Sequence, residues 1–237
     1  MNCHTYSYAL IITRGVFFGE SEIALKSQSL IYFTGKPSLM STSPRTPEHP
    51  IMPQFVERWS PRAFSDKAVT EDQVLTILEA ARWAPSASNL QPWRFIYGIK
   101  GEPEFDTLLS LLVPFNEGWA RSAGALIFIT SVTTFDGERQ NITNSFDAGS
   151  AFMSLALQTH GMGLISHGMA GIEYEKAPVV LDLPVNLKVE AAVAIGYQGD
   201  VSSLVDYLQP REVPSQRLAL SEIAFKGKFT GEIKAPG

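Results

Sequence analysis

The sequence predicts a layered fold of the α/β or α+β class, for two reasons. Helical and strand-like patterns alternate along the chain from about residue 70 onward. Residues 125–132 and 188–197 are continuous apolar runs rich in β-forming residues, which is typical of strands buried on both faces. Helices that alternate with buried strands pack as layers on a sheet. A chain of 237 residues suffices for a single large domain, or for two small ones, with a sizeable core.

The first helix is expected directly after Thr70. Thr70 and Gln73 form a capping-box pattern, and Val69 with Val74 can form the hydrophobic staple outside it. Apolar residues then recur at helical spacing as far as Pro85, where the helix must end.

The later elements follow from the same patterns. Residues 94–99 predict a short strand, and residues 104–112 a helix closed by Pro114. Asn144 or Ser145 can cap a long helix that runs through His160 and is apolar nearly all round, so we expect it in a core or a subunit interface. Gly161 ends this helix; strands are expected over 164–167 and 188–197, and an irregular arm from residue 210.

Composition excludes several classes of protein. The net charge of -5 argues against a chain that holds nucleic acid by bulk electrostatics, although an anionic cofactor needs only two or three well-aimed cations. Cys3 is the only cysteine, so an internal disulfide and a thiolate metal cluster are excluded and a cytoplasmic location is expected.

The first fifty residues are expected to lie outside the folded core. Residues 8–18 are apolar but interrupted by Arg14, too short to cross a membrane and a poor signal peptide. Residues 38–53 are rich in Ser, Thr and Pro, which is typical of a flexible lead-in. We therefore expect an extension over residues 1–52 and a domain over 53–237. Chains that begin at Met40 or Met52 are both expected to keep the binding properties of the protein.

Two segments carry side chains suited to ligand binding. In the first, Arg58, Ser60 and Arg62 alternate along an expected extended stretch, so they would share one face. Two guanidinium groups and a hydroxyl suit a phosphate or carboxylate. The alternative is an exposed loop with scattered cations.

The second segment, residues 84–95, follows the first helix and enters a strand. Asn89 and Gln91 both donate and accept hydrogen bonds, as a flat heterocycle with C=O and N–H edges requires. The alternative is ordinary turn chemistry, because Ser, Asn and Pro are common turn residues.

Together and in this order, the two segments resemble those of the nitroreductase family of flavoproteins. That family has an Arg-x-Ser-x-Arg/Lys segment, then a capped helix, then Pro-Ser-x-x-Asn-x-Gln-Pro-Trp. The resemblance covers residue 56 to the C-terminus, and the matching residues are Arg58, Ser60, Arg62, Pro85, Ser86, Asn89, Gln91, Pro92, Trp93, Trp119, Ala120, residues 161–171 and residues 214–217. The motifs are specific for the family and unspecific for substrate.

The resemblance implies an α+β three-layer α/β/α sandwich with a mostly antiparallel central sheet and a C-terminal arm. It implies FMN as cofactor, with Arg58 and Ser60 on the phosphate and Arg62 near the N1–C2=O edge, where a cation stabilises reduced flavin. Asn89 would bind the pyrimidine side of the ring. The full set of expected cofactor-binding residues is Arg58, Trp59, Ser60, Arg62, Ser86, Ser88, Asn89, Gln91, Met169, Ala170, Gly171 and Arg217.

The chain departs from the family pattern at two positions. Some relatives carry a carboxylate where Ala170 stands, which leaves a backbone N–H near Gly171 as the expected contact to flavin N5. Family members commonly place two cations on the phosphate near the C-terminus. Here Arg217 is kept, whereas Ser215 stands where a lysine is the familiar partner.

The resemblance also implies a function. A homodimer would hold FMN at its interface, with each site drawing residues from both chains. NADH or NADPH would reduce FMN, which would then reduce a small-molecule acceptor such as a nitroaromatic compound or a quinone, in a ping-pong reaction. The cofactor carries this chemistry, so no catalytic side chain is expected. A flavin reductase, a metabolite-specific dehydrogenase, a non-catalytic flavin-binding protein and a binder of another anion remain alternatives.

No metal, membrane or nucleic-acid partner is expected. His160 and His167 have no Cys or carboxylate at ligand spacing, so each is expected to be a packed or capping histidine. The tryptophans are expected in the core, with Trp119 the best candidate for a substrate contact. The sequence has neither a G-x-G-x-x-G motif nor a P-loop.

Overall fold

A computed structural model describes residues 45–233. Cys3, Met40 and the apolar stretch over residues 8–18 lie outside the described residues.

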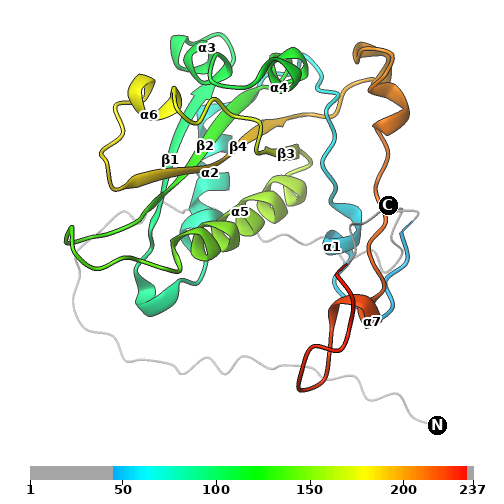
Figure 1. The fold of residues 1–237 in the computed structure, drawn as a ribbon. Helices are drawn as coiled ribbons and strands as arrows, with labels where there is room; N and C mark the ends of the chain where they lie inside the picture. Colours follow the sequence, from blue (N-terminus) through cyan, green and yellow to red (C-terminus); the bar gives the residue numbers. More distant parts are fainter. Residues whose placement is uncertain (1–44, 234–237) are drawn as a thin grey trace, which may run out of the picture. The chain divides into compact units, whose positions relative to one another are not determined.

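A sheet of four strands forms the centre of the fold (Figure 1). The strands are β1 (Trp93–Ile99), β2 (Ala125–Val132), β3 (Ile165–Met169) and β4 (Leu187–Gly196), in the order β1-β2-β4-β3. Every neighbouring pair is antiparallel. Every residue of β2 is buried, as its continuous apolar run predicts.

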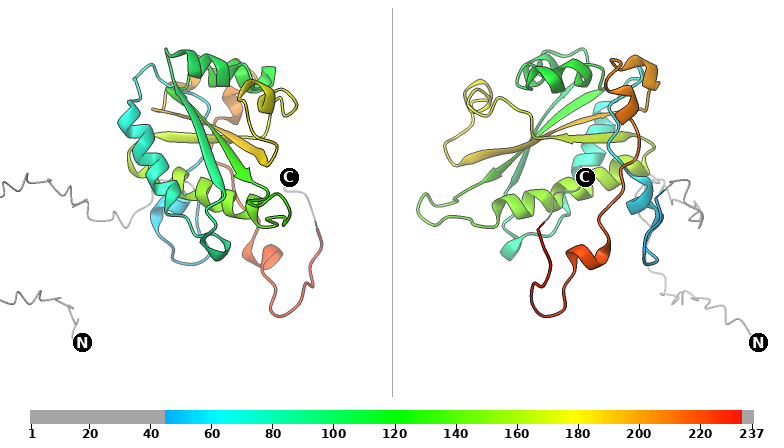
Figure 2. Two further views of the ribbon diagram at one scale, coloured as in Figure 1. Left: turned by 90° about the vertical axis from the view of Figure 1, so that its left-hand side faces the viewer. Right: turned by 45° about the vertical axis from the view of Figure 1, so that its right-hand side comes forward.

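Helices cover both faces of the sheet (Figures 1 and 2). The helices α2 (Glu71–Arg82) and α5 (Asn144–Gly161) pack on the face that carries Ile127 and Ile129. The helices α3 (Pro103–Leu109) and α4 (Pro114–Ala120) pack on the face that carries Leu126 and Phe128, where α6 (Ala177–Val180) also lies. Because side chains alternate across a strand, β2 supplies both cores at once. The predicted three-layer α+β sandwich is confirmed.

Short elements make up the remainder. They are α1 (Pro53–Glu57), the 3₁₀ turns η1 (Ala87–Asn89), η2 (Val201–Ser203) and η3 (Gln209–Arg211), and α7 (Leu220–Ile223) in the C-terminal arm. Within residues 45–233, no helix combines the length and apolar character needed to cross a membrane.

The start of α2 is as predicted. The Thr70 hydroxyl accepts from the backbone N–H of Gln73 at 3.3 Å, and the Gln73 side chain accepts from the N–H of Thr70 at 3.0 Å. Val69 and Val74 are both buried in the same core cluster. These contacts are local in sequence, which is why the pattern alone could identify them.

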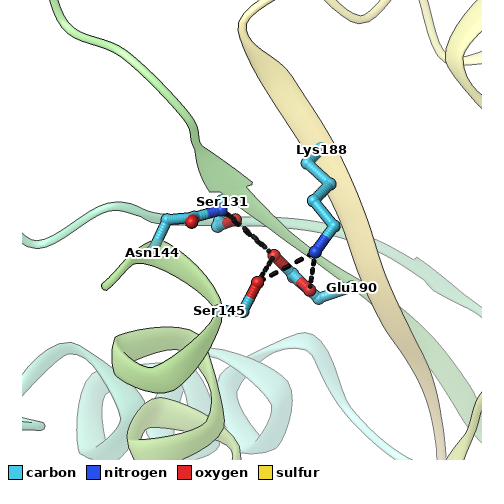
Figure 3. A network of polar contacts seen from close by, with 5 residues as sticks. All are labelled: Ser131, Asn144, Ser145, Lys188 and Glu190. Carbon is cyan, nitrogen blue, oxygen red and sulfur yellow. Dashed lines mark hydrogen bonds and ion pairs between the residues drawn. The ribbon is translucent and has the colours of Figure 1, made fainter. Parts of the chain in front are cut away.

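The start of α5 differs from the prediction. The residue before the helix is Thr143, with no side-chain cap, so the expectation that Asn144 or Ser145 caps it is wrong. Both side chains instead join a polar network at the ends of β2 and β4 (Figure 3). Glu190 accepts from Ser131 at 2.6 Å and from Ser145 at 2.8 Å, and Lys188 lies 3.1 Å from its other oxygen. The network fixes the first turn of α5 on the sheet.

The apolar surface of α5 is incompletely covered within a single chain. Ala148, Ala151 and Leu155 are buried against the sheet. Phe146 is 78% exposed, and Met153 is also exposed. One face of the helix therefore lies in the core, and the expected interface role of the other face stays a prediction.

Two further predictions about helix ends differ from the structure. The helix expected over residues 104–112 ends at Leu109. Pro114 was expected only to close that helix, but it also begins α4, because its fixed φ suits the first turn and its missing N–H is not needed there.

Candidate functional site

Residues 58–62, here called the cation segment, run extended from the end of α1 toward the sheet. Arg58 follows the helix with φ −62° and ψ 128°, and Phe64 forms an isolated bridge with Gln198. Nη1 of Arg58 lies 3.4 Å from the Ser60 hydroxyl oxygen, so these two predicted phosphate ligands lie together. Trp59 lines a neighbouring cavity of about 250 Å³ that reaches His160.

Two other arginines lie close to Arg58. Nη2 of Arg45 donates to the Arg58 carbonyl at 3.0 Å. Burial lowers the pKa of Arg58, and the charges of Arg217 and Arg45 lower that pKa further. Arg217 therefore lies within electrostatic range of Arg58, and their shared role on a phosphate stays a prediction. Several guanidinium groups close together favour an anionic ligand.

Arg62 is held through its backbone by Glu212. One oxygen of this carboxylate accepts from the N–H of Arg62 at 2.6 Å and from that of Ala63 at 2.7 Å. Glu212 is only 6% exposed, and its second oxygen has no hydrogen-bond partner among the described residues. The guanidinium of Arg62 lies 5.9 Å from the centre of the Trp119 ring. Glu212 was missed from the sequence, because no local pattern connects residues 150 positions apart.

His167 packs behind the same segment. Its Nδ1 lies 3.0 Å from the Pro61 carbonyl, which can only accept, so Nδ1 carries the proton. Its ring centre lies 4.7 Å from that of Trp119. Burial first, and then the charge of Arg62, lower the pKa of His167 to about 4, so the ring is neutral near pH 7. The geometry fits a packed histidine, and no group of three metal-ligating side chains occurs within residues 45–233.

The predicted N5 segment lies at the end of β3. Met169 is buried and Ala170 is exposed. Nδ2 of Asn116, on α4, donates to the Gly171 carbonyl at 3.2 Å. A Cβ on residue 171 would collide with the ends of the Asn116 and Val113 side chains, so a larger residue here would force these side chains to shift. Asn116 was not identified from the sequence, where it is one polar residue in a short helix.

Residues 86–91, here called the amide segment, are exposed from Ala87 onward and include three residues in a strained backbone conformation. Ser88, Asn89 and Gln91 have φ values of 50°, 56° and 47°, in the left-handed region. Non-glycine residues in that region cost on the order of 1 kcal/mol each and gather at ligand-binding loops. The segment is held largely by itself: the N–H of Gln91 donates to the Ser86 hydroxyl at 3.0 Å, and its side chain donates to the Asn89 carbonyl at 2.9 Å.

A single chain keeps the two segments at opposite ends of α5 (Figure 1). The N–H of Ala87 lies 3.3 Å from both carboxylate oxygens of Asp147, in the first turn of the helix. At the other end, Nε2 of His160 lies 3.7 Å from the carboxylate of Glu57, the residue before the cation segment. Asp147 and His160 are 13 positions apart, which corresponds to about 20 Å of helix. Ser86, Ser88, Asn89 and Gln91 are therefore not brought to Arg58, Ser60 and Arg62 within one chain.

Three buried donors near the cation segment have no hydrogen-bond partner within residues 45–233. They are Nε of Arg58, Nε of Arg62 and Nε1 of Trp119. Unpaired buried donors are rare, because each loses the hydrogen bonds it makes to water. Donors of this kind, two of them charged, fit a ligand rich in acceptor oxygens, such as a phosphorylated flavin.

Comparison with known proteins agrees with the fold. The family model described as "Nitroreductase family" matches residues 56–104. A crystal structure of an "oxidoreductase containing FMN" is 46% identical, covers 81% of this chain and all of its own, and superposes with a TM-score of 0.79. A candidate nitroreductase from Desulfovibrio desulfuricans, crystallised with FMN, is 26% identical over 78% of this chain and all of its own, with a TM-score of 0.61.

One curated relative is named for a dehydrogenase activity. A Thermus thermophilus protein named "NADH dehydrogenase" is 25% identical over 199 residues, which span 71% of this chain and 91% of the relative. With the solved structure that matches at 46% identity over its full length, these findings establish that the chain belongs to the nitroreductase family of oxidoreductases.

Proposed function

We propose that the protein is an FMN-dependent enzyme that takes electrons from NADH or NADPH and passes them to a small-molecule acceptor, such as a nitroaromatic compound or a quinone. The observation that carries this proposal is the cation segment with its unpaired buried donors beside Arg217. Two similar structures are described as containing FMN, which supports the same cofactor.

The residues divide into two roles. Arg58, Ser60 and Arg217 bind the phosphate, since they combine guanidinium groups with a hydroxyl. Arg62, held in place by Glu212, puts a fixed positive charge at the edge of the ring where reduced flavin is negative. Bound FMN supplies the acceptance and release of hydride. The protein binds, orients and tunes the flavin, and no side chain acts as a nucleophile.

A second copy of the chain completes each site. The amide segment lies about 20 Å of helix away from the cation segment of its own chain. In a twofold dimer, the amide segment of one copy can reach the cation segment of the other, and the symmetry produces two such sites. The exposed Phe146 lies one position before Asp147, which holds the amide segment, so this surface is suited to the interface.

The test is the visible spectrum of the purified protein before and after anaerobic addition of NADPH, and separately of NADH. A flavin band that bleaches supports the proposal. Absence of flavin binding even after FMN is added would refute it in favour of another anion. A band that neither donor bleaches would favour a non-catalytic flavin-binding protein. Acceptor screening with nitroaromatics, quinones and free flavin then separates a broad reductase from a flavin reductase or a dedicated dehydrogenase.

A further inference from the structure

We propose that Arg45 is a third phosphate-binding cation of the flavin site, in the role that Ser215 leaves without a lysine. This inference rests on the proposed FMN function. It concerns a residue outside every segment that carries the family resemblance, and within the predicted extension over residues 1–52.

Arg45 is held against the start of the cation segment and borders a cavity. Its side chain donates through Nη2 to the Arg58 carbonyl at 3.0 Å, and the residue is only 8% exposed. Arg45 and Arg217 also line one cavity of about 350 Å³, together with residues of α1 and α7. Arg45 therefore contacts the residue that begins the cation segment and faces the same space as the C-terminal cation.

The C-terminal arm brings this stretch of the chain into place. The backbone N–H of Leu220 donates to the Glu48 carboxylate at 2.8 Å, which ties residues 45–48 to the arm that carries Arg217. Glu48 also lines the cavity, and one oxygen of its carboxylate accepts this hydrogen bond. Residues 45–48, which lie shortly before Arg58 in sequence, thus pack against the distant arm that carries Arg217.

Three guanidinium groups, those of Arg45, Arg58 and Arg217, lie within electrostatic range of one another, and the Glu48 carboxylate lines the cavity that Arg45 shares with Arg217. Burial and the nearby Arg217 both lower the pKa of Arg45, and the pKa of Arg58 is lowered by burial, Arg217 and Arg45. Mutual repulsion of this kind is relieved when a dianion binds between the cations. Arg217 directs Nη1 at the Ser215 hydroxyl, 3.1 Å away, and at the Ser215 carbonyl, 3.3 Å away. Ser215 thus orients Arg217 but adds no charge, and Arg45 supplies the additional cation.

The experiment compares the binding of FMN with that of riboflavin, which has the same ring and lacks the phosphate. Dissociation constants are measured by flavin fluorescence for the wild type and for Arg45→Ala, Arg45→Gln and Arg45→Lys. Arg139→Ala is the matched control, since it removes the same charge from an exposed loop. Loss of a charge-assisted contact predicts weaker FMN binding by about 10- to 100-fold in Arg45→Ala and Arg45→Gln. Riboflavin binding should change by less than about twofold, and Arg45→Lys should retain some of the FMN affinity.

The outcomes separate the inference from the function on which it rests. A wild type that binds neither flavin refutes the proposed function. The role of Arg45 is refuted if the wild type binds FMN and Arg45→Ala binds it with the same affinity. It is also refuted if Arg45→Ala loses the same factor of affinity for FMN and for riboflavin. Wild-type affinity in Arg45→Gln also refutes it, because glutamine can still donate to the Arg58 carbonyl but carries no charge.

The same inference revises one expectation about the start of the chain. A protein that begins at Met40 retains Arg45, whereas one that begins at Met52 loses it. The shorter protein should bind FMN less tightly than the longer one and riboflavin equally well. Equal FMN affinity in the two proteins would contradict the proposal.

Discussion

The cation segment and the amide segment are held in opposite ways. The cation segment is fixed by three remote groups: the Glu212 carboxylate, the His167 ring and the Arg45 guanidinium. The amide segment is exposed, carries three left-handed residues and is bound to the rest of the chain through the Asp147 carboxylate. One region is organised within a single chain, while the other presents a strained surface outward.

This contrast indicates how the site is divided. If the cation segment binds the phosphate as proposed, the ordering cost is small, because its backbone is already fixed. A strained exposed segment persists only when its surroundings hold it, and such strain is typical of positions that meet a ligand or partner. On the proposed function, each chain would supply a preorganised phosphate half to one site and a ring-binding half to another.

The largest expected effect is that of removing the Glu212 carboxylate. In Glu212→Ala, the N–H groups of Arg62 and Ala63 lose their acceptor, which should lower the free energy of unfolding by about 2–4 kcal/mol in chemical denaturation. Glu212→Gln keeps one acceptor oxygen and should lose about half as much. Hydrogen exchange should accelerate at residues 62 and 63 and stay unchanged at residues 87–91. Equal acceleration in both segments would remove the contrast between them.

The second largest expected effect is the dependence of the free energy of unfolding on pH. The folded protein holds the pKa of His167 at about 4, below the ordinary value of 6.5. Between these two pH values, His167 is protonated in the unfolded chain but not in the folded chain. The free energy of unfolding therefore falls by up to about 3 kcal/mol as the pH drops from about 6.5 to about 4.

The variant His167→Gln isolates this contribution. Glutamine can still donate to the Pro61 carbonyl but does not titrate, so the unfolding free energy should depend less on pH over that range. In the wild type near the lower end of that range, hydrogen exchange should increase in the cation segment and not in the amide segment. A pH profile identical to that of the wild type would rule out His167 as its source.

The smallest expected effect concerns strain in the amide segment. Glycine adopts a φ of 50° without penalty, so Ser88→Gly should change the free energy of unfolding by less than about 1 kcal/mol, because the relief of strain is offset by a more flexible unfolded chain. Ser88→Val should destabilise the apoprotein by about 1–2 kcal/mol. Thermal unfolding without flavin measures both. If Ser88→Val is neutral, the segment is not strained as described.

The features of the fold that the sequence predicted depend on neighbouring residues. The capping box of Thr70 and Gln73 and the apolar run of β2 are complete within a few positions, and both are observed. The caps proposed for α5 were wrong, because the Glu190 carboxylate on another element takes up Asn144 and Ser145. Capping rules consider only neighbouring residues, so they cannot predict a hydrogen-bond acceptor on a distant strand.

In the candidate site, too, only the features that depend on neighbouring residues were predicted from the sequence. The proximity of Arg58 and Ser60 follows from their alternate positions in an extended segment. Glu212, Asn116 and Arg45 were not predicted, because each acts on a segment that only the folded chain brings near. The separation of the two segments along α5 also depends on tertiary packing and has no signature in the motifs.

The central claim is that the two segments from different chains form one site, and mixed dimers test it most directly. Arg58→Glu disables the phosphate half, and Asn89→Asp disables the ring half. Each protein alone should bind FMN weakly. When the two are co-expressed with different affinity tags and purified as mixed dimers, one of the two sites combines an intact cation segment with an intact amide segment. The account predicts wild-type FMN affinity at one site per mixed dimer; mixed dimers that bind FMN as weakly as either parent would contradict it.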